Sequence, residues 1–193
     1  MSHSIVVERF GIRLRPVSMD DASFIHELRS SPELSKYIGE IDPRISVHRL
    51  WLMQYLLSEN DYYFCIELLS GKRIGTISVY NIEGGRGNWG RWIISPSVPA
   101  AAASVWLILH VAFDILELSE VYSNTVIDNA SVISFHDSCG FVRTGIEPKG
   151  LTIRGVAYDM VIHAVTRDSW PSIQSRLVKP ATLAERLLNE DMD

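Results

Sequence analysis

Residues 128–141, DNASVISFHDSCGF, contain the start and the end signal of a short helix. Asp128 and Asn129 favour the N-cap position of a helix, and Gly140 is typical of the position just after a helix ends. The residues between them predict a single helix of about two and a half turns. Phe141 follows the glycine directly.

His136 lies on the apolar face of this predicted helix. It follows Val132 by four residues and Ile133 by three, and residues at these spacings share one face of an α-helix. The side chain is therefore expected to face the protein interior. A histidine in this setting is either a satisfied core residue or a group with a chemical role.

Hydrophobic periodicity on both sides of this stretch predicts a mixed α/β order. Runs rich in β-branched and aromatic residues indicate strands, and apolar residues at helical spacing behind capping residues indicate helices. Strands are expected over residues 11–17, 62–68, 73–82, 89–95, 121–127, 141–151 and 155–166. Further helices are expected from Ser18 to near residue 31, over 47–57, and over 104–118, which is apolar on nearly every side and therefore central.

The chain is expected to form one domain. Its 193 residues, 47% hydrophobic and 21% charged, are ordinary for a globular domain with a sizeable core. We expect this domain to span residues 1–179, with Pro180 separating a helical tail over residues 180–193. In the tail, Leu183, Leu187 and Leu188 are candidates for a homodimer contact or for docking on their own domain.

The composition argues against several classes of partner. A net charge of −5 lacks the clustered basic residues of a nucleic-acid-binding domain. Cys65 and Cys139 lie inside a strand-like and a helix-like pattern, which indicates buried thiols in a reducing compartment. The longest apolar run, residues 105–113, is too short to span a bilayer. We therefore expect a cytoplasmic protein with no nucleic-acid or membrane partner and no metal site.

The order of elements and the opening stretch resemble the GNAT superfamily of acyl-CoA-dependent N-acetyltransferases. The similarity covers roughly residues 11–170, with a weaker motif over residues 157–170, and is nearest to the amino-sugar and ribosomal-protein N-terminal acetyltransferase branches. It implies an α/β (α+β) fold whose mixed, mostly antiparallel sheet of about seven strands is flanked by helices, with splayed fourth and fifth strands. The most specific matching residues are Asn129, Val132, Ile133, Phe135, His136, Gly140 and Phe141.

The resemblance also implies acetyl-CoA as co-substrate. In the superfamily the pantetheine pairs with the exposed edge of the fourth strand, here residues 92–95, where a backbone N–H near Ile94 would stabilise an oxyanion. The pyrophosphate lies at the N-terminus of the central helix, where free N–H groups and the helix dipole favour an anion. The implied cofactor-binding residues are Ile94, Ser95, Ala101, Ala102, Ala103, Ser104 and Asn129, the last being alternatively a structural cap.

The loop before the central helix departs from the superfamily pattern. The family places an arginine or glutamine there, followed by glycines, whereas this chain has Pro99 followed by alanines 100–103 and Ser104. Proline as the first helical residue and alanine within it favour a well-formed helix start, whose N–H groups at residues 101–104 remain suited to an anion. The alternative is a helix start that binds no ligand.

The resemblance gives His136 a candidate catalytic role. In much of the superfamily this position is a tyrosine that protonates the departing thiolate, and a histidine with an ordinary pKa near 6.5 could donate or accept that proton. Glu83 and Asp128 are the candidate general bases, or else solvated loop acids. No acid occurs in residues 89–95, which favours an acceptor amine of low pKa that needs little help in losing its proton.

The acceptor is expected to be the primary amine of a small molecule. Residues 27–38 and 60–67 resemble acetyltransferases that act on nucleotide-linked amino sugars of surface-glycan biosynthesis, where the first helices form the acceptor pocket. Acetylation of a protein N-terminal amine is one alternative, and a non-catalytic binding module of the same fold is another. The candidate acceptor-binding residues are Arg29, Tyr37, Tyr80 and Trp89, each with core packing as its alternative.

Overall fold

The computed structural model describes residues 3–190. These residues form an eight-stranded sheet with the strand order β1-β2-β3-β4-β5-β6-β8-β7. Neighbouring strands are antiparallel except β5 and β6, which are parallel. The predicted mixed, mostly antiparallel sheet is therefore confirmed, with eight strands rather than about seven. Within residues 3–190 no helix is both long and apolar enough to cross a membrane.

The elements follow one another much as the hydrophobic pattern predicts. The strands are β1 Val7–Arg9, β2 Ile12–Pro16, β3 Tyr62–Leu68, β4 Arg73–Glu83, β5 Arg86–Ile94, β6 Glu120–Val126, β7 Val142–Ile153 and β8 Val156–Thr166. The α-helices are α1 Ala22–Ser30, α2 Ile45–Tyr55, α3 Ala101–His110, α4 Ala130–Cys139 and α5 Trp170–Glu190. A short 3-10 helix, Met19–Asp21, precedes α1, and a π-helical turn, Val111–Ile115, follows α3.

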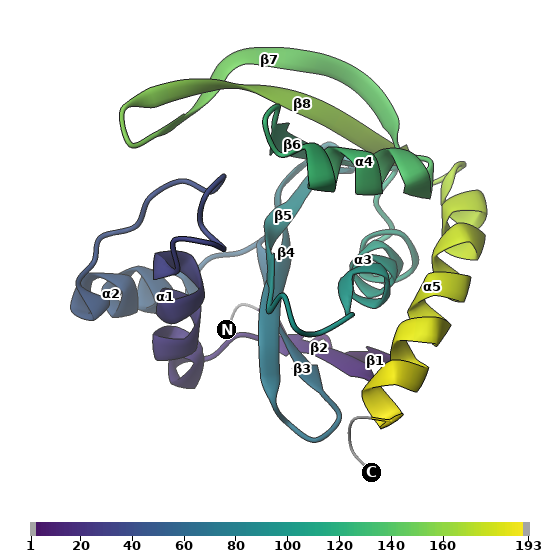
Figure 1. Cartoon of the computed structure of the whole chain (residues 1–193), viewed down its shortest axis with the longest axis horizontal. Coiled ribbons are helices and arrows are strands. Elements are labelled where there is room, and N and C mark those ends of the chain that lie inside the picture. Colours follow the sequence, from purple (N-terminus) through teal and green to yellow (C-terminus); the bar gives the residue numbers. More distant parts are fainter. Residues whose placement is uncertain (1–2, 191–193) are drawn as a thin grey trace.

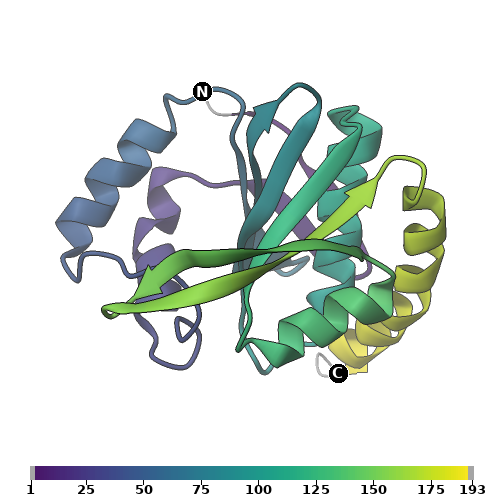
Figure 2. The same ribbon diagram turned by 90° about the horizontal axis from the view of Figure 1, so that it is seen from above.

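Helices cover both faces of the sheet (Figures 1 and 2). The pair α1 and α2 packs on one face, while α3 and α5 pack on the other. The long hairpin of β7 and β8 crosses over one end of the molecule towards the connection between α1 and α2. A hydrogen bond joins the hairpin to this connection, because the backbone N–H of Arg154 at the hairpin turn donates to the side-chain Oε2 of Glu40 at 2.9 Å.

Helix α3 is the central helix that the sequence predicts, although its start and end differ. Residues 102–109 are all buried, as the apolar sequence on every side requires. Pro99, expected as the first helical residue, lies outside the helix, which begins at Ala101 after an N-cap at Ala100. The regular helix ends at His110 and the predicted segment continues as the π-helical turn.

The expected break at Pro180 is wrong, because α5 runs through it without interruption. Six residues at helical spacing hold α5 against the core, and Pro180 itself is exposed on the opposite side. Burial of this stripe of six side chains outweighs the cost of a proline inside a helix, about 3 kcal/mol, which includes the loss of one backbone hydrogen bond. Leu188 docks on its own domain, whereas Leu183 and Leu187 are exposed. The stripe consists of Trp170, Ile173, Leu177, Ala181, Ala184 and Leu188.

Strand β1 was not predicted. It forms a hairpin with β2 through Phe10 and Gly11, which both have positive φ angles, 57° and 75°. Two consecutive residues of positive φ make the tight turn that suits a two-residue hairpin. Only the glycine signals this turn in the sequence, because phenylalanine rarely adopts such a conformation.

Strands β5 and β6 separate, as the sequence resemblance implies. Their parallel pairing covers only three positions and ends at Asn88 opposite Tyr122. Beyond that point β5 continues to Ile94 and β6 to Val126. The two strands therefore leave an opening in the middle of an otherwise continuous sheet.

Candidate active site

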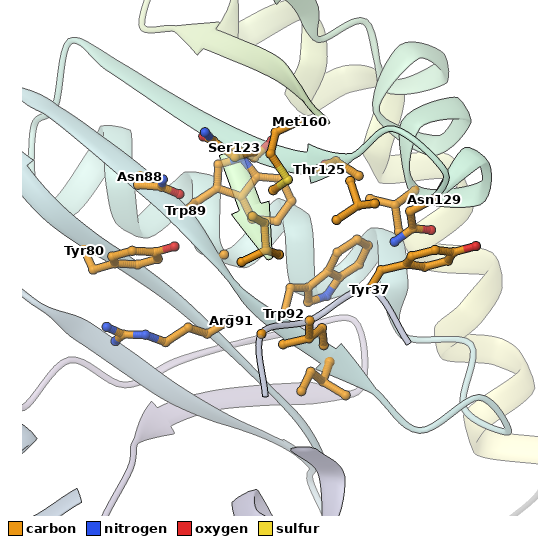
Figure 3. Close-up of a pocket in the computed structure, with 18 of the residues that line it drawn as sticks. Tyr37, Tyr80, Asn88, Trp89, Arg91, Trp92, Ser123, Thr125, Asn129 and Met160 are labelled. Carbon is orange, nitrogen blue, oxygen red and sulfur yellow. The ribbon is translucent and has the colours of Figure 1, made fainter. Parts of the chain in front are cut away.

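The opening between β5 and β6 leads into a cavity of about 360 Å³ (Figure 3). Its walls come from β3, β4, β5, β6, α4, the last turn of α1 and the loop after it, and the β7–β8 hairpin. Five tyrosines and tryptophans line the cavity, and none of its lining residues is an aspartate or glutamate. Six residues predicted for the site line it, namely Arg29, Tyr37, Tyr80, Trp89, Asn129 and His136.

A bulge in β5 produces the opening. The pairing with β4 shifts between Thr76 opposite Ile93 and Ser78 opposite Gly90, so β5 carries one extra residue at this point. Arg91 in the bulge has a φ of 47°, a conformation that non-glycine residues rarely adopt. The hydroxyl of Thr76 donates to the carbonyl oxygen of Arg91 at 2.9 Å, and that of Ser78 to Gly90 at 3.2 Å. These bonds hold the irregular strand in place, and a bulge of this kind bends its strand.

Beyond the bulge, β5 presents a free edge to the opening. The Ser95 N–H donates to the Ile74 carbonyl oxygen at 2.8 Å, so it points towards β4. Successive residues of a strand direct their N–H groups to opposite sides, and the Ile94 N–H therefore faces away from β4, towards the opening. The backbone thus supports the predicted donor near Ile94, whereas the N–H of Ser95 is already used.

The N-terminus of α3 has free N–H groups but no side-chain cap. Those of Ala101, Ala102 and Ala103 have no acceptor within residues 3–190, while the N–H of Ser104 donates to the Ala100 carbonyl oxygen at 2.9 Å. The Ser104 hydroxyl donates to the Ala101 carbonyl oxygen at 2.9 Å and accepts from Trp92 Nε1 at 3.2 Å. Three backbone donors therefore fit an anion at this end, and Ser104 has no free polar group to offer it.

His136 reaches the cavity from α4, and its ring is 1% exposed. It packs among aromatic rings, with centroid distances of 5.1 Å to Phe141, 5.2 Å to Trp89 and 5.0 Å to His163. Neither ring nitrogen has a hydrogen-bond partner in residues 3–190. Burial, reinforced by the neighbouring His163, lowers the pKa of His136 to about 3. The imidazole is therefore neutral near pH 7, and one ring nitrogen carries a proton that it can donate in a hydrogen bond.

Asn129 occupies the N-cap position of α4, but its side chain makes no capping hydrogen bond. Its Oδ1 instead accepts from the Ser131 hydroxyl at 3.1 Å. The alternative of a side-chain cap is thus not observed. The amide lines the cavity at the same end as Tyr37 (Figure 3), where it can contact a ligand.

Arg91 and Tyr80 form the other end of the cavity in the view of Figure 3. The Arg91 guanidinium makes a bidentate ion pair with Asp61, at 2.7 and 2.9 Å. It also lies over the ring of Tyr80, 4.4 Å from the centroid. The tyrosine hydroxyl is turned towards the cavity, and burial raises the pKa of Tyr80. This end of the cavity therefore offers an aromatic surface and a compensated positive charge.

The two predicted general bases do not line the cavity. Glu83 is exposed at the turn between β4 and β5, at the end where β5 and β6 are paired rather than separated. Asp128 follows β6 and is also exposed. Both therefore fit their alternative interpretation as solvated loop acids, and the structure assigns neither a role in proton transfer.

Several lining residues were not singled out from the sequence. Trp92, Ser123 and Thr125 line the cavity from β5 and β6, and Leu151 and Met160 from the β7–β8 hairpin (Figure 3). Ser123 and Thr125 alternate along β6 and are buried, so two polar residues on one face of a strand were the available signal. Nothing in the local pattern of β7 and β8 indicates that the hairpin crosses over this opening.

The described residues include no group of three or more histidine, cysteine, aspartate or glutamate side chains placed to hold a metal ion. Cys65 and Cys139 are both buried free thiols. Burial raises the pKa of Cys65 to about 12 and that of Cys139 to about 11, so both are protonated near neutral pH. The polar groups of the cavity are therefore hydroxyls, amides, guanidiniums, an imidazole and backbone N–H groups.

Comparisons with known proteins agree with this geometry. A GCN5-related N-acetyltransferase from Brucella melitensis has 19% sequence identity and a TM-score of 0.79, over 92% of this chain and 85% of that one. A spermidine N-acetyltransferase from Vibrio cholerae, solved with CoA and spermine, has 20% identity and a TM-score of 0.77, over 84% of this chain and 99% of that one. No curated protein matches the sequence significantly. The family model for the acetyltransferase (GNAT) domain matches residues 12–142, and the chain belongs to this family.

Proposed function

We propose that this protein is an N-acetyltransferase that moves an acetyl group from acetyl-CoA to the primary amine of a small molecule. The observation that carries the proposal is the separation of β5 and β6 next to the free N–H groups of α3. The free edge of β5 suits an extended amide-containing chain, and the start of α3 suits a phosphate group. Acetyl-CoA supplies a thioester whose acetyl group is open to attack by an amine.

The residues around the opening account for the steps of such a transfer. The amine nitrogen forms a bond to the carbonyl carbon as the carbon–sulfur bond breaks, and one amine proton is passed through water to the sulfur. The Ile94 N–H faces the opening and can stabilise the negative charge that develops on the carbonyl oxygen. His136 can donate a hydrogen bond to the departing sulfur from its neutral ring, since its lowered pKa excludes a charged imidazolium near pH 7.

The residues that line the cavity also indicate the pKa of the acceptor amine. Because no carboxylate lines it, the enzyme offers no strong internal base for an amine with a pKa near 10.4. An amine with a pKa near that of an α-amino group, about 7.7 to 8, is partly neutral at pH 7 to 8 and loses its last proton to ordered water. We therefore propose an acceptor amine of low pKa.

Among acceptors, a nucleotide-linked amino sugar remains our first proposal. The aromatic walls of Tyr37 and Tyr80 suit a sugar or base, and Arg29, which has no carboxylate partner in residues 3–190, suits phosphate. A polyamine such as the spermine bound by the Vibrio cholerae protein would meet arginines and no carboxylate here. A protein N-terminus is the alternative, and the cover that the β7–β8 hairpin places over the cavity favours the smaller acceptor.

Thermal denaturation with and without CoA or acetyl-CoA tests the proposal. Ligand at about 100 times Kd should add about 2.7 kcal/mol to the stability of the folded state. Acetyl-CoA should also support acetylation of amines in a thiol-release assay. Stabilisation by CoA without turnover would favour a non-catalytic binding module, and no stabilisation by either compound would contradict the transferase.

The oligomeric state and location belong to the same proposal. Leu183 and Leu187 are the exposed leucines of α5 and are the candidates for a homodimer contact. Light scattering of the wild type and of a Leu183→Glu variant would test this contact. We retain the expectation of a cytoplasmic enzyme that needs no metal.

A further inference from the structure

Arg29, in the last turn of α1, is a half-buried cation without a carboxylate partner in residues 3–190. Its one hydrogen bond runs from Nη2 to the Gly39 carbonyl oxygen at 3.0 Å. A guanidinium has five N–H donors, so most of its hydrogen-bonding capacity is unused. The side chain lines the cavity between β5 and β6.

Other arginines of comparable burial are paired. Arg15 contacts Asp21 at 2.7 Å and Glu67 at 2.9 Å, Arg13 contacts Glu67 at 3.1 Å, and Arg91 contacts Asp61 at 2.7 Å. Burial lowers the pKa of Arg29, and the positive charge of Arg91 lowers it further. An arginine remains protonated in proteins nonetheless. Arg29 is thus a half-buried charge without a carboxylate partner in residues 3–190, and an anion bound in the cavity would offset the cost of its partial burial.

The nearest acids do not compensate this charge. Glu40 and Asp42 line a smaller cavity that also includes Arg29, but neither lines the main cavity. Glu40 accepts the backbone N–H of Arg154 at 2.9 Å, and Asp42 pairs with Arg44 at 2.6 and 2.8 Å. Arg29 therefore lines the main cavity with donors that bind no carboxylate in residues 3–190, and no acid lines that cavity.

We propose that the acceptor carries an anionic group, a carboxylate or a phosphate, and that Arg29 binds this group while the amine faces the free edge of β5. This inference rests on the proposed function and narrows the acceptor from any primary amine of a small molecule to one that also carries an anionic group. Helices α1 and α4 lie on opposite sides of β4 and β5 (Figures 1 and 2), so Arg29 and His136 approach the cavity from different sides. An acceptor between them has its anion and its reacting amine at separate ends.

Matched pairs of amines test the proposal with the wild-type enzyme and acetyl-CoA. One pair is an α-amino acid and its decarboxylated amine, and the other is glucosamine 6-phosphate and glucosamine. Spermidine serves as the cationic compound. We expect the anionic member of at least one pair to have the higher kcat/KM, and the pair that responds distinguishes a carboxylate from a phosphate. A preference for spermidine or for both members that lack the anionic group would overturn the proposal.

Substitutions then assign the effect to Arg29. Arg29→Gln should raise KM for the preferred anionic acceptor by on the order of 10- to 100-fold, the usual loss for a charged hydrogen bond, and Arg29→Lys should restore part of it. The member of the pair that lacks the anionic group should be affected much less. Arg49→Gln, on the exposed side of α2, is the matched control and should change neither value. Equal effects of Arg29→Gln on both members would overturn the assignment.

Two binding measurements separate this inference from the proposed function. Stabilisation by CoA should be the same in the wild type and in Arg29→Gln, because Arg29 lies away from the start of α3. If CoA does not stabilise the wild type, the transferase proposal itself is contradicted. The same anionic amines should raise the melting temperature of the wild type, without CoA, more than that of Arg29→Gln. If they stabilise both proteins equally or neither, the anion site is wrong even if CoA binds.

Discussion

Among single residues, the role of His136 in the transfer is the first to test, because its ring lines the cavity and is neutral near pH 7. His136→Phe keeps an aromatic ring in the cluster and removes the N–H donor. We expect kcat to fall by about 10- to 100-fold, at the low end for proton donors, while the CoA-induced thermal shift is retained. His136→Tyr, which restores a hydroxyl donor, should keep more activity than His136→Phe. A rate unchanged by His136→Phe would make the residue purely structural.

The lowered pKa of His136 also predicts how stability depends on pH. In the unfolded chain the ring binds a proton below its ordinary pKa near 6.5, whereas the folded protein resists protonation down to about pH 3. The unfolded state therefore binds more protons in this window, and stability falls as pH falls from 6.5 towards 3, by up to about 1.4 kcal/mol per pH unit.

His136→Phe lacks this group, so its free energy of unfolding should fall less between pH 7 and pH 5, by about 2 kcal/mol. Burial also lowers the pKa of His3 and His48, but both are present in the two proteins and cancel in the comparison. Urea denaturation of both proteins at the two pH values measures the difference. Parallel losses of stability would mean that His136 is readily protonated in the folded state.

The sequence could place single residues near the site better than it could assign their roles. The helical spacing of Val132, Ile133 and His136 fixed which face turns inwards, and His136 does line the cavity. The helical spacing could not reveal that the ring packs against Trp89 and His163, because these residues come from β5 and β8. Its lowered pKa is a product of that tertiary packing.

At the scale of elements, the start of α3 is the feature in which the sequence departs most from its family. Alanines in place of glycines leave the N–H groups of residues 101–103 free, so the backbone retains the property that binds anions. This explains how a loop without the family's arginine and glycines can still serve a phosphate group. The proposal for CoA binding therefore depends on backbone donors rather than on side chains.

Ala101→Glu tests this dependence with two effects of opposite sign. A carboxylate in the first turn of a helix is favourable to the dipole, by about 0.3–1 kcal/mol, so the free protein should be as stable as the wild type or slightly more so. The same charge should repel a phosphate, and we expect the Kd for CoA to rise at least about 10-fold. Ala101→Gln controls for side-chain size. Equal CoA affinity in the wild type and Ala101→Glu, by calorimetry, would place the phosphate elsewhere.

Periodicity predicts most elements but not how they end or continue. It placed seven of the eight strands because their apolar runs are long and bounded by turn residues. It missed β1, which is only three residues long, and it began a separate helical tail at Pro180 because the rule against proline in helices is local. In the folded chain the buried stripe on both sides of the proline decides.

At the scale of the whole molecule, the charge of the cavity is opposite to that of the protein. The chain carries a net charge of −5, yet no acid lines the cavity, and its lining includes Arg29, which has no carboxylate partner in residues 3–190, besides the Asp61-paired Arg91. Composition alone therefore suggests a cationic acceptor, whereas the folded chain offers a site for an anion. Packing of α1 against β4 brings Arg29 to the cavity, which a count of charges cannot express.

The acceptor side of the cavity is also a product of distant segments. Leu151 of the β7–β8 hairpin lines it and approaches Gly39 of the loop after α1, while Tyr37 packs with Ile153 and Met160. The hairpin and this loop are more than a hundred residues apart, and the bond from the Arg154 N–H to Glu40 ties them together. Shape at this end of the cavity therefore depends on contacts made only in the complete fold.

Leu151→Ala should enlarge this end of the cavity without touching β5 or α3. We expect KM for the acceptor to rise by about 5- to 150-fold, since apolar contacts of this size are worth about 1–3 kcal/mol, while the Kd for CoA stays unchanged. Stability should fall only modestly, because Leu151 is half-buried. Leu69→Ala, an exposed leucine at the turn between β3 and β4, is the matched control and should alter neither constant. Steady-state kinetics with calorimetry for CoA measures both quantities, and a loss of CoA affinity in Leu151→Ala would mean that the hairpin covers the cofactor rather than the acceptor.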